Sequence, residues 1–351
     1  MALQIEQTDD NYKNRGLTGL ANLGNTCFLN STLQCLSHCY ELNNFLQKGA
    51  YKSKINKIPD SLILIEWDKL RKLMWSENCI ISPNGFVRQI QRVAKIKDKD
   101  IFTGFAQNDL TEFLGFVIDC FNNSIKREVK MNITGNPESN TDILAKKCFE
   151  MMKNMYSKEY SEFIDLFYGI HVSQIKSLES DYINIVPEPF FNITIPLTKE
   201  NKPHHINDCF DLYTKIETLD GDNRILNDKT NEKESAEKSI HFWSLPHIMV
   251  ITLKRFNVSS VSIRKNNALV DFEETLDLSK YVIGYNKNSY VYELFGICNH
   301  MGGVHGGHYT SFVKNANNSW YHFNDTEVSK IKDFNSMKTK QAYCFFYRKK
   351  K

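Results

Sequence analysis

Residues 19–30 read Gly-Leu-Ala-Asn-Leu-Gly-Asn-Thr-Cys-Phe-Leu-Asn, so Cys27 follows a glycine-bearing turn and opens an apolar segment. Apolar side chains recur at helical spacing through Leu29, Leu33 and Leu36, which predicts a helix that begins at or near Cys27. Backbone N–H groups and the macrodipole at a helix N-terminus favour the thiolate, the form of cysteine that attacks carbonyl carbons. Cys27 is therefore our candidate nucleophile, against the usual structural role of a reduced cysteine.

The other cysteines and the N-terminal residues indicate a compartment. The chain has nine cysteines in 351 residues, and no two of them have Cys-x-x-Cys spacing. An odd count with irregular spacing is typical of reduced thiols in a cytosol or nucleus rather than of a disulfide framework. Residues 1–15 are polar and include three acidic side chains, which matches neither a signal peptide nor a transit peptide. We expect an intracellular protein with a loose N-terminal arm at residues 1–15.

Composition argues against several classes of protein. Hydrophobic residues make up 41% of the chain, which is ample for a folded core. The longest apolar runs, such as residues 247–253, are far too short to cross a bilayer. The 44 basic and 41 acidic residues leave a net charge of +3, which gives little reason to expect a nucleic-acid partner. We expect a monomer with no membrane or nucleic-acid partner, and we interpret the basic residues 348–351 as a functionally silent end.

The spacing of apolar residues changes near residue 166. From residue 16 to residue 165 apolar residues recur at spacings of three and four, as in residues 113–121, which predicts a mostly helical half. Residues 220–238 are polar and charged and predict an exposed loop or hairpin. The second half otherwise turns to short strand-like runs, at residues 190–196, 247–256 and 290–297. The fold class is therefore α+β, with helices first and strands second.

A cysteine nucleophile needs a base, and three histidines compete for that role near the C-terminal end. Residues 309–313 and 320–323 predict two strands of a hairpin, and His308 lies at the start of the first strand. His300 and His305 are interpreted as loop residues, because glycines surround them. Strand geometry therefore favours His308 as the base.

The predicted hairpin also supplies a third residue. If the hairpin is centred on Ala316, His308 lies directly opposite Asn324. The amide oxygen of Asn324 can then hold the imidazole tautomer that faces Cys27. A shift of one residue in register presents Asp325 instead. We rank Asn324 first and expect Asn324→Ala to lower turnover more than Asp325→Ala.

Asn22 lies five residues before Cys27 and carries an amide that can donate to an oxyanion, together with the backbone N–H of Cys27. Asparagine is also common in tight turns, so a turn residue is the alternative interpretation. The residues alone leave both interpretations open.

Residues 19–31 resemble the cysteine box of the ubiquitin-specific proteases, which are papain-like cysteine deubiquitinases. Residues 306–310 and 320–325 resemble the histidine box of the same family. Residues 107–114 are similar to its middle box, and residues 253–256 to the strand found before its histidine box. These landmarks fall in the family's order and extend over nearly the whole chain, and the two long boxes are highly specific.

The resemblance implies a right-hand architecture. In this family an α-rich thumb carries the cysteine, a β-rich palm carries the histidine, and fingers grip ubiquitin. We expect the thumb at residues 16–165, the fingers at residues 166–245 and the palm at residues 246–348, which together form one catalytic domain, 16–348. The helix-then-strand pattern of the sequence agrees with this papain-like α+β fold.

The resemblance also implies an activity and a partner. The expected reaction is hydrolysis of the isopeptide or peptide bond after the C-terminal glycine of ubiquitin, through a thioester that water resolves. Ubiquitin or a ubiquitinated protein is the expected partner. The implied catalytic residues are Cys27 as nucleophile, His308 as general base and acid, Asn324 as the residue that orients it, and Asn22 at the oxyanion.

Further residues are expected to bind substrate, namely Gln107, Asp109, Glu112, Gly306, Gly307 and Tyr309. The glycines suit a narrow approach for a tail that ends without side chains, and they can equally be hinges of a loop. Asn108 stands where the family commonly has a second glutamine. Asp109 and Glu112 also have the spacing of a helix N-cap and its box partner, and both roles can hold together.

In the ubiquitin-specific proteases the fingers often carry a zinc ribbon of two Cys-x-x-Cys pairs. This chain departs from that pattern. The matching places read Ser-Leu-Glu-Ser at residues 177–180 and Asn-Asp-Lys-Thr at residues 227–230. Ser, Asn and Thr are poor zinc ligands, and His204 and His205 have no partners at structural-site spacing. We therefore predict no metal and no cofactor, with fingers held by strand pairing and packing.

Two alternatives to an active deubiquitinase remain open. The first is a catalytically silent module that keeps the right-hand fold and binds ubiquitin. Such a module is expected to lose the nucleophile or the base, and this chain has both. The same chemistry can also act on a ubiquitin-like modifier, because the residues that would separate it from ubiquitin are dispersed over the fingers.

Overall fold

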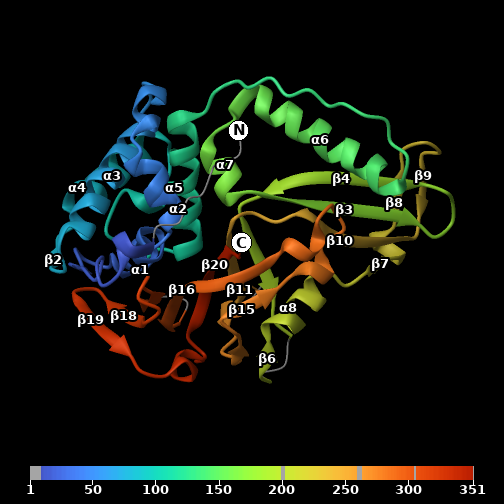
Figure 1. Ribbon diagram of the computed structural model, residues 1–351. Coiled ribbons are helices and arrows are strands. Elements are labelled where there is room, and N and C mark those ends of the chain that lie inside the picture. Colours follow the sequence, from blue (N-terminus) through green and yellow to red (C-terminus); the bar gives the residue numbers. More distant parts are fainter. Residues whose placement is uncertain (1–8, 199–201, 259–262, 304–305, 351) are drawn as a thin grey trace.

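A computed structural model describes residues 9–198, 202–258, 263–303 and 306–350, and the chain folds as a helical thumb, a palm sheet and an extended fingers sheet (Figure 1). None of the helices in these residues is long and apolar enough to span a membrane. The α-helices are α1 (Cys27–Ser37), α2 (Tyr40–Gln47), α3 (Ser61–Ser76), α4 (Asn84–Ile96), α5 (Leu110–Ile125), α6 (Asn140–Glu159), α7 (Glu162–Phe167) and α8 (Ile206–Tyr213). Short 3₁₀ helices include η1 (Asp9–Tyr12), η2 (Ala50–Lys54), η3 (Asp100–Phe102), η4 (Gly221–Asn223), η5 (Ser279–Tyr281), η6 (Lys287–Ser289) and η7 (Phe334–Met337).

The strands form two main sheets. The palm sheet runs in the order β19 (Glu327–Ile331), β18 (Trp320–Asn324), β17 (Gly307–Lys314), β16 (Val291–Gly302), β20 (Ala342–Lys349), β11 (Ile248–Lys254) and β5 (Asn192–Pro196), with β15 (Thr275–Asp277) also paired to β16. The fingers sheet runs in the order β4 (Ile183–Phe190), β3 (Gly169–Ser177), β10 (Ala236–Ser244) and β7 (Glu217–Leu219). Short pairs are β1 (Gly19–Leu20) with β2 (Ile80–Ile81), β6 (His204–His205) with β14 (Val270–Asp271), β8 (Ile225–Asn227) with β9 (Glu232–Glu234), and β12 (Phe256–Val258) with β13 (Ile263–Lys265).

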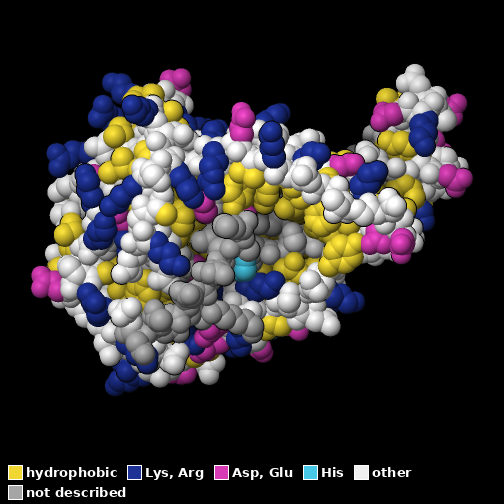
Figure 2. Space-filling model, turned by 45° about the horizontal axis from the view of Figure 1, so that its top comes forward, with side chains coloured by type: hydrophobic (Ala, Val, Ile, Leu, Met, Phe, Trp, Pro, Cys, Tyr) yellow, Lys and Arg dark blue, Asp and Glu magenta, His cyan; other side chains and the backbone are white. Residues whose placement is uncertain are grey.

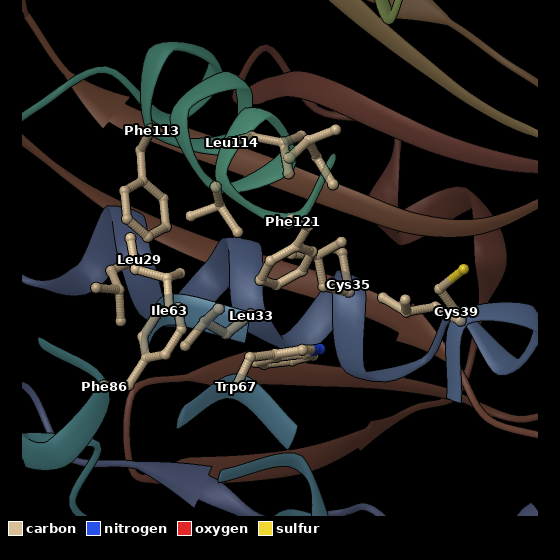
Figure 3. Packing of buried hydrophobic residues seen from close by; sticks show 14 of the residues in the cluster. Leu29, Leu33, Cys35, Cys39, Ile63, Trp67, Phe86, Phe113, Leu114 and Phe121 are labelled. Carbon is tan, nitrogen blue, oxygen red and sulfur yellow. The ribbon is translucent and has the colours of Figure 1, made fainter. Parts of the chain in front are cut away.

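Helix α1 is buried on every side, because it lies between the other thumb helices and the palm sheet. Each of its residues is buried, and it contacts α5 as well as β16, β17 and β18. Figure 3 shows Leu29 and Leu33 of α1 packed among Phe113 and Phe121 of α5 and Trp67 of α3. Full burial of such side chains contributes about 1.5–3 kcal/mol each. This packing fixes the N-terminus of α1 against the strands of the palm.

The palm takes up part of the range that the sequence assigns to the fingers. Strand β5 pairs in parallel with β11, so it belongs to the palm sheet. Helix α8 buries Ile206 and Phe210 in the same core as Ile195 of β5 and Phe345 of β20. The expected fingers range of 166–245 is therefore too broad, because alternating apolar residues reveal a strand but not the sheet that it joins.

The fingers are a sheet covered on one face by α6. Strand β10 pairs with β3 from Ala236 opposite Ser177 onward, and α6 lies along β3 and β4 (Figure 1). Cys148 of α6 packs with Val172 of β3 and Trp243 of β10 in a small core of its own. The polar stretch of residues 220–238 contains the β8–β9 hairpin that the sequence leads us to expect.

Strand β20, the last in the chain, lies between β16 and β11 in the middle of the palm sheet. Its Arg348 is buried, donates to the backbone oxygen of His38 at 2.8 Å and lies 3.3 Å from Glu41 of α2. The guanidinium also stacks over the rings of Tyr40 and Phe295 at 4.6 and 4.5 Å. The interpretation of residues 348–351 as a silent end is therefore wrong for Arg348, which joins palm to thumb.

Candidate active site

Cys27 is the first residue of α1, where the sequence predicts it, and its side chain is only 2% exposed. The turn before it is held by Asn22, whose side-chain oxygen accepts from the backbone N–H groups of Gly24 and Thr26 at 3.1 Å each. Gly24 and Asn25 both have positive φ, at 97° and 56°, which glycine and asparagine tolerate best. The composition of this turn thus sets the start of the helix and the position of the thiol.

Burial of Cys27 disfavours its thiolate form, whereas its place at a helix N-terminus favours that form. The pKa of the Cys27 thiol is raised above its ordinary value, chiefly because burial disfavours the charged form. The backbone N–H of Tyr309, which faces the sulfur, lowers this pKa, and the negative charge of Asp325 raises it. The N–H groups at the start of α1 lower this pKa, as their place in the sequence predicts, but burial has the larger effect and favours the protonated thiol.

His308 and Asn324 are joined as the sequence predicts, although through a different register. The Nε2 atom of His308 lies 2.6 Å from Oδ1 of Asn324. Strand β17 pairs with β18 so that Ser311 faces Phe323, which displaces the hairpin from its predicted centre at Ala316 and puts Asn324 diagonal to His308. An even displacement keeps both side chains on one face of the sheet. Because Nε2 is taken by Asn324, Nδ1 is the ring nitrogen left for a proton from Cys27.

Among the described hydrogen bonds, those of Asp325 go not to His308 but to the turn that carries Cys27. Its Oδ2 accepts from the amide of Asn22 at 2.9 Å, and its Oδ1 accepts from the amide of Asn30 at 2.7 Å. Its backbone oxygen accepts from Leu20 at 2.8 Å, and its own φ is 51°. The carboxylate thus ties β18 to both ends of the Cys27 segment.

Sequence reasoning missed Asn30. It lies on α1, is buried, and also donates to the backbone oxygens of Leu20 and Ala21 at 3.2 and 3.3 Å. The available signal was a polar residue one turn after Cys27, but α1 carries other buried polar residues, so this signal does not single out Asn30. Its partner Asp325 lies far away in the sequence, so no local pattern identifies the contact.

Asn22 keeps one donor for an oxyanion. A side-chain amide has two N–H hydrogens, and only the bond to Asp325 uses one of them within the described residues. The backbone N–H of Cys27 lies in the first turn of α1, where helical N–H groups have no acceptor within the helix. Both roles weighed for Asn22 therefore fit, since its oxygen holds the turn and its amide nitrogen retains a hydrogen.

Gln107 and Gly307 close on each other. The amide nitrogen of Gln107 donates to the oxygen of Gly307 at 2.6 Å, and its amide oxygen accepts from the N–H of Gly307 at 2.7 Å. A side chain at position 307 would clash, because a Cβ there would lie 2.2 Å from the oxygen of Met301 and 2.4 Å from His300 Nε2. Gly306 lies beside the same amide, with its Cβ position 3.3 Å from Gln107 Oε1. These three predicted substrate residues form one strap.

His300 is buried in β16, so the interpretation of it as a loop residue is wrong. Its ring packs 4.6 Å from that of Tyr309, and burial lowers its pKa to about 4. His300 is therefore a neutral packing residue beneath the Gln107–Gly307 strap. His305 lies outside the described residues.

Asp109 caps α5 as its position in the sequence suggests. Its Oδ1 accepts from the N–H groups of Thr111 and Glu112 at 2.8 and 3.2 Å, and its Oδ2 accepts from the hydroxyl of Tyr343 at 2.6 Å. Both of its oxygens are thus occupied within the protein. Glu112 is exposed on the first turn of α5 and is the carboxylate of this pair that remains available to a ligand.

The places of the family's zinc ligands hold a hydrogen-bonded cluster instead. Glu234 is buried and accepts from Ser180 and from Asn227 at 2.7 Å each. The hydroxyl of Ser177 accepts from the backbone N–H groups of Glu179 and Ser180 at 3.0 and 3.1 Å. These hydroxyls and amides, together with Thr230, do not fit zinc, which prefers thiolate and imidazole. Within the described residues, no group of three or more His, Cys, Asp or Glu gathers to hold a metal.

Comparison with known proteins agrees with the geometry. A family model described as ubiquitin carboxyl-terminal hydrolase matches residues 18–347. The chain is 34% identical to ubiquitin carboxyl-terminal hydrolase 2 of Bos taurus over 345 residues, covering 95% of this chain and 55% of that relative. It is 32% identical to ubiquitin carboxyl-terminal hydrolase Usp2 of Drosophila melanogaster over 361 residues, covering 97% of this chain and 37% of that relative. The chain thus spans about half or less of the length of these curated relatives.

Solved structures share the fold. The chain resembles the SAGA Ubp8/Sgf11/Sus1/Sgf73 DUB module bound to ubiquitin aldehyde with a TM-score of 0.73 and 24% identity, covering 99% of this chain and 72% of that chain. It resembles the yeast SAGA DUB module with an Sgf73 mutant with a TM-score of 0.74 and 23% identity, covering 99% of this chain and 71% of that chain. The predicted α+β right-hand fold is confirmed by these likenesses.

Proposed function

The chain belongs to the ubiquitin carboxyl-terminal hydrolase family, and from that premise we propose that it is a thiol-dependent deubiquitinase. Its substrate is the peptide or isopeptide bond after the C-terminal glycine of ubiquitin. The solved relative that holds ubiquitin aldehyde supports this ligand. The observation that carries the proposal is the bond of 2.6 Å between His308 and Asn324 on a strand whose next residue, Tyr309, faces the Cys27 thiol with its N–H.

The first half of the proposed reaction transfers the acyl group to sulfur. Sγ of Cys27 attacks the carbonyl carbon of the terminal glycine as Nδ1 of His308 takes the thiol proton. Asn324 holds the ring through Nε2 and favours the tautomer with its lone pair on Nδ1. The imidazolium then gives its proton to the leaving amine, the C–N bond breaks, and a thioester to Cys27 remains.

The second half releases ubiquitin. Water attacks the thioester as His308 takes its proton, and the proton returns to sulfur when the C–S bond breaks. In both halves the negative oxygen accepts from the backbone N–H of Cys27 and from the remaining N–H of Asn22. Removal of one such donor costs about 10²–10³-fold in kcat in a well-studied protease.

We assign the approach for ubiquitin's tail to the space under the strap of Gln107, Gly306 and Gly307. Two terminal glycines need a slot without side chains, and position 307 admits none. Tyr309 lines this slot beside the thiol, and Glu112 offers a carboxylate to basic residues of a ligand. Asp109 acts here as a helix cap that positions Glu112.

We further propose that the protein needs no zinc, acts inside the cell and is a monomer. The fingers work without zinc, because the Glu234 cluster occupies the places of the ligands. The protein acts in a reducing intracellular compartment, which suits nine cysteines that are all free. It acts as a monomer without a nucleic-acid partner.

Labelling by ubiquitin that carries a C-terminal thiol-reactive warhead tests the proposal. We expect a stable adduct with the native chain and none with Cys27→Ala. Cys79→Ala is the matched control, because Cys79 is the partly exposed thiol among the nine, and it should label like the native chain.

The other outcomes separate the alternatives. No adduct with ubiquitin or with any ubiquitin-like probe, in a protein that still binds ubiquitin, would identify a silent binding module. An adduct with a ubiquitin-like probe alone would change the substrate and keep the mechanism.

A further inference from the structure

Helix α4 presents a basic face without acidic partners. Residues 84–97 contain four basic and no acidic side chains, while the whole chain carries a net charge of only +3. Arg88, Arg92 and Lys95 are exposed, and in the described part of the chain none of the three forms an ion pair. Lys97 differs, because its ammonium group is paired with Asp60. Lys and Arg side chains gather on the thumb side of the molecule in Figure 2.

The three cations lie on one side of the helix. Successive residues of an α-helix are about 100° apart, so positions 88, 92 and 95 fall within about one sixth of a turn. We call Arg88, Arg92 and Lys95 the basic face. Gln91 lies next to it on the same side and donates to the backbone oxygen of Gly104 at 3.3 Å.

This contact connects the basic face to the nucleophile. Gly104 precedes Phe105, whose backbone oxygen accepts from the side chain of Asn25 at 3.0 Å. Asn25 belongs to the turn that opens α1, two residues before Cys27. The chain of contacts runs from α4 through Gly104 and Phe105 to the catalytic turn.

Apolar side chains accompany the basic face. Phe105 is 56% exposed and contacts the turn at Gly24, with the Cβ position of Gly24 3.8 Å from its ring. Ile96 at the end of α4 and Ile101 of η3 are 53% and 41% exposed. A surface that combines unpaired cations with exposed apolar side chains is typical of a binding site for a protein segment rather than a solvated helix face.

We propose that the basic face, together with Phe105, binds an acidic segment of the protein to which ubiquitin is attached. This inference rests on the proposed function, since it names what lies on the leaving-group side of the scissile bond. The strap of Gln107 and Gly307 lies on the side that we assign to ubiquitin's tail. Phe105, beside the turn at Gly24 and Asn25, remains exposed near the nucleophile. Carboxylates of the acceptor complement three cations, and its apolar side chains pack on Phe105. A nucleic-acid ligand is disfavoured because isoleucines lie among the cations.

The test compares leaving groups on the same ubiquitin. One substrate carries a small coumarin amide at ubiquitin's C-terminus, the second carries a lysine peptide flanked by Glu and Leu, and the third carries the same peptide with Gln in place of Glu. The enzymes are the full native chain, the triple variant Arg88→Glu/Arg92→Glu/Lys95→Glu, and a control, Lys146→Glu/Lys147→Glu/Lys153→Glu, which makes an equal charge change on exposed positions of α6.

We expect the native chain and the α6 control to cleave the acidic conjugate with a kcat/KM about tenfold above that of the Gln conjugate, at low salt. The α4 variant should lose this preference and keep its rate on the coumarin substrate within about twofold. High salt should reduce the preference of the native chain in the same way.

Several results would overturn the inference. The α4 variant could keep its preference for the acidic conjugate, or it could lose the coumarin activity equally, which would place the effect on ubiquitin or on folding. Binding of a DNA or RNA duplex that only the α4 variant loses would assign the face to nucleic acid. Failure of the native chain on the coumarin substrate would instead contradict the proposed function, so the two failures are distinguishable.

Discussion

At the scale of single residues, the proposed active site uses two adjacent side chains differently: a carboxamide binds the proposed base, and a carboxylate holds the turn that carries the proposed nucleophile. Asn324 bonds to His308, and its neighbour Asp325 bonds to Asn22 and Asn30. Adjacent residues can do this because side chains alternate along a strand and because Asp325 lies in the left-handed region, at φ 51°. Substitution of the two residues should therefore have different signatures.

Asn324→Ala should lower kcat by about 10²-fold or more, because His308 loses the acceptor that fixes its tautomer. Asn324→Ala should lower the free energy of unfolding by less than Asp325→Ala does. Asp325→Ala removes two charge-assisted hydrogen bonds worth about 1.5–3 kcal/mol each. Turnover of a ubiquitin substrate and urea unfolding measure the two effects. Equal loss of stability in both variants would contradict this division, and a smaller loss of turnover for Asn324→Ala would transfer the main role to Asp325.

The raised pKa of Cys27 predicts slow reaction with small electrophiles. Below that pKa the thiol is protonated, so alkylation by iodoacetamide at pH 7 should be slower than for a free cysteine and should rise with pH beyond 9. Asp325→Asn removes a charge that raises this pKa, and it should shift the rate profile to lower pH. Mass spectrometry of the Cys27 peptide follows the reaction. A profile at or below that of a free thiol in the native chain would show that the helix N-terminus outweighs burial.

At the scale of elements, local chemistry predicts some features and long-range contacts decide others. The start of α1 at Cys27 and the cap of α5 at Asp109 follow from turn and cap residues that stand next to each other in the sequence. The hairpin of β17 and β18 was predicted with the wrong centre. Its turn closes from Asn315 to Ser319, and Asn318 takes the positive φ of 60°. Several asparagines stand here, and each can occupy such a position, so composition does not select the register.

The contacts of the buried polar residues could not be predicted either, because their partners lie far away in the sequence. Asn30 finds its partner Asp325 and Arg348 finds Glu41 only when thumb and palm meet. Hydrophobic periodicity identifies the elements but gives no information on pairs about 300 residues apart. His300 was assigned to a loop because glycines follow it, whereas β16 continues through it to Gly302.

The tip of the fingers should depend on Glu234. Hydrogen bonds from Ser177, Ser180 and Asn227 hold the pKa of this carboxyl below its ordinary value. Its contribution to stability is therefore fully present above the ordinary pKa of about 4.3 and is lost as the pH falls through the lowered pKa. At pH 7, Glu234→Gln should speed hydrogen exchange about tenfold in residues 177–180 and 225–234.

The matched control for this cluster is Glu232→Gln, because Glu232 is exposed on the same strand. Its exchange rates should equal those of the native chain. Equal loss of protection in both variants would remove the special role of Glu234. Elemental analysis that finds one zinc per chain would contradict the proposal that the fingers hold no metal.

At the scale of the whole molecule, one buried cation attaches the palm to the thumb. Arg348 of β20 reaches Glu41 and the backbone of His38 on the thumb side and stacks between two aromatic rings. Because Glu41 is also buried, neither charge can return to water without separating the two halves. This attachment supplements the direct packing of α1 against β16, β17 and β18.

Arg348→Met should destabilise the protein by about 3–5 kcal/mol, since it leaves the carboxylate of Glu41 buried and unpaired. Lys350→Met is the control, because Lys350 is exposed two residues further on, and it should stay within about 0.5 kcal/mol of the native chain. Urea unfolding provides both values. Addition of Glu41→Gln to Arg348→Met should restore part of the loss, and a double variant as unstable as the single one would exclude the unpaired charge as its cause.

The central place of β20 has a consequence for how the protein is made. Cys27 emerges from the ribosome well before the strand at Ala342–Lys349, which completes the middle of the palm sheet. At about 5–20 residues per second, Cys27 waits roughly a quarter of a minute to a minute for this strand. During that interval β16 and β11 lack their shared neighbour, so the chain on the ribosome cannot assemble a competent thiol and histidine. Under the proposed function, the nascent chain therefore stays inert towards ubiquitin conjugates around the translating ribosome until β20 has emerged.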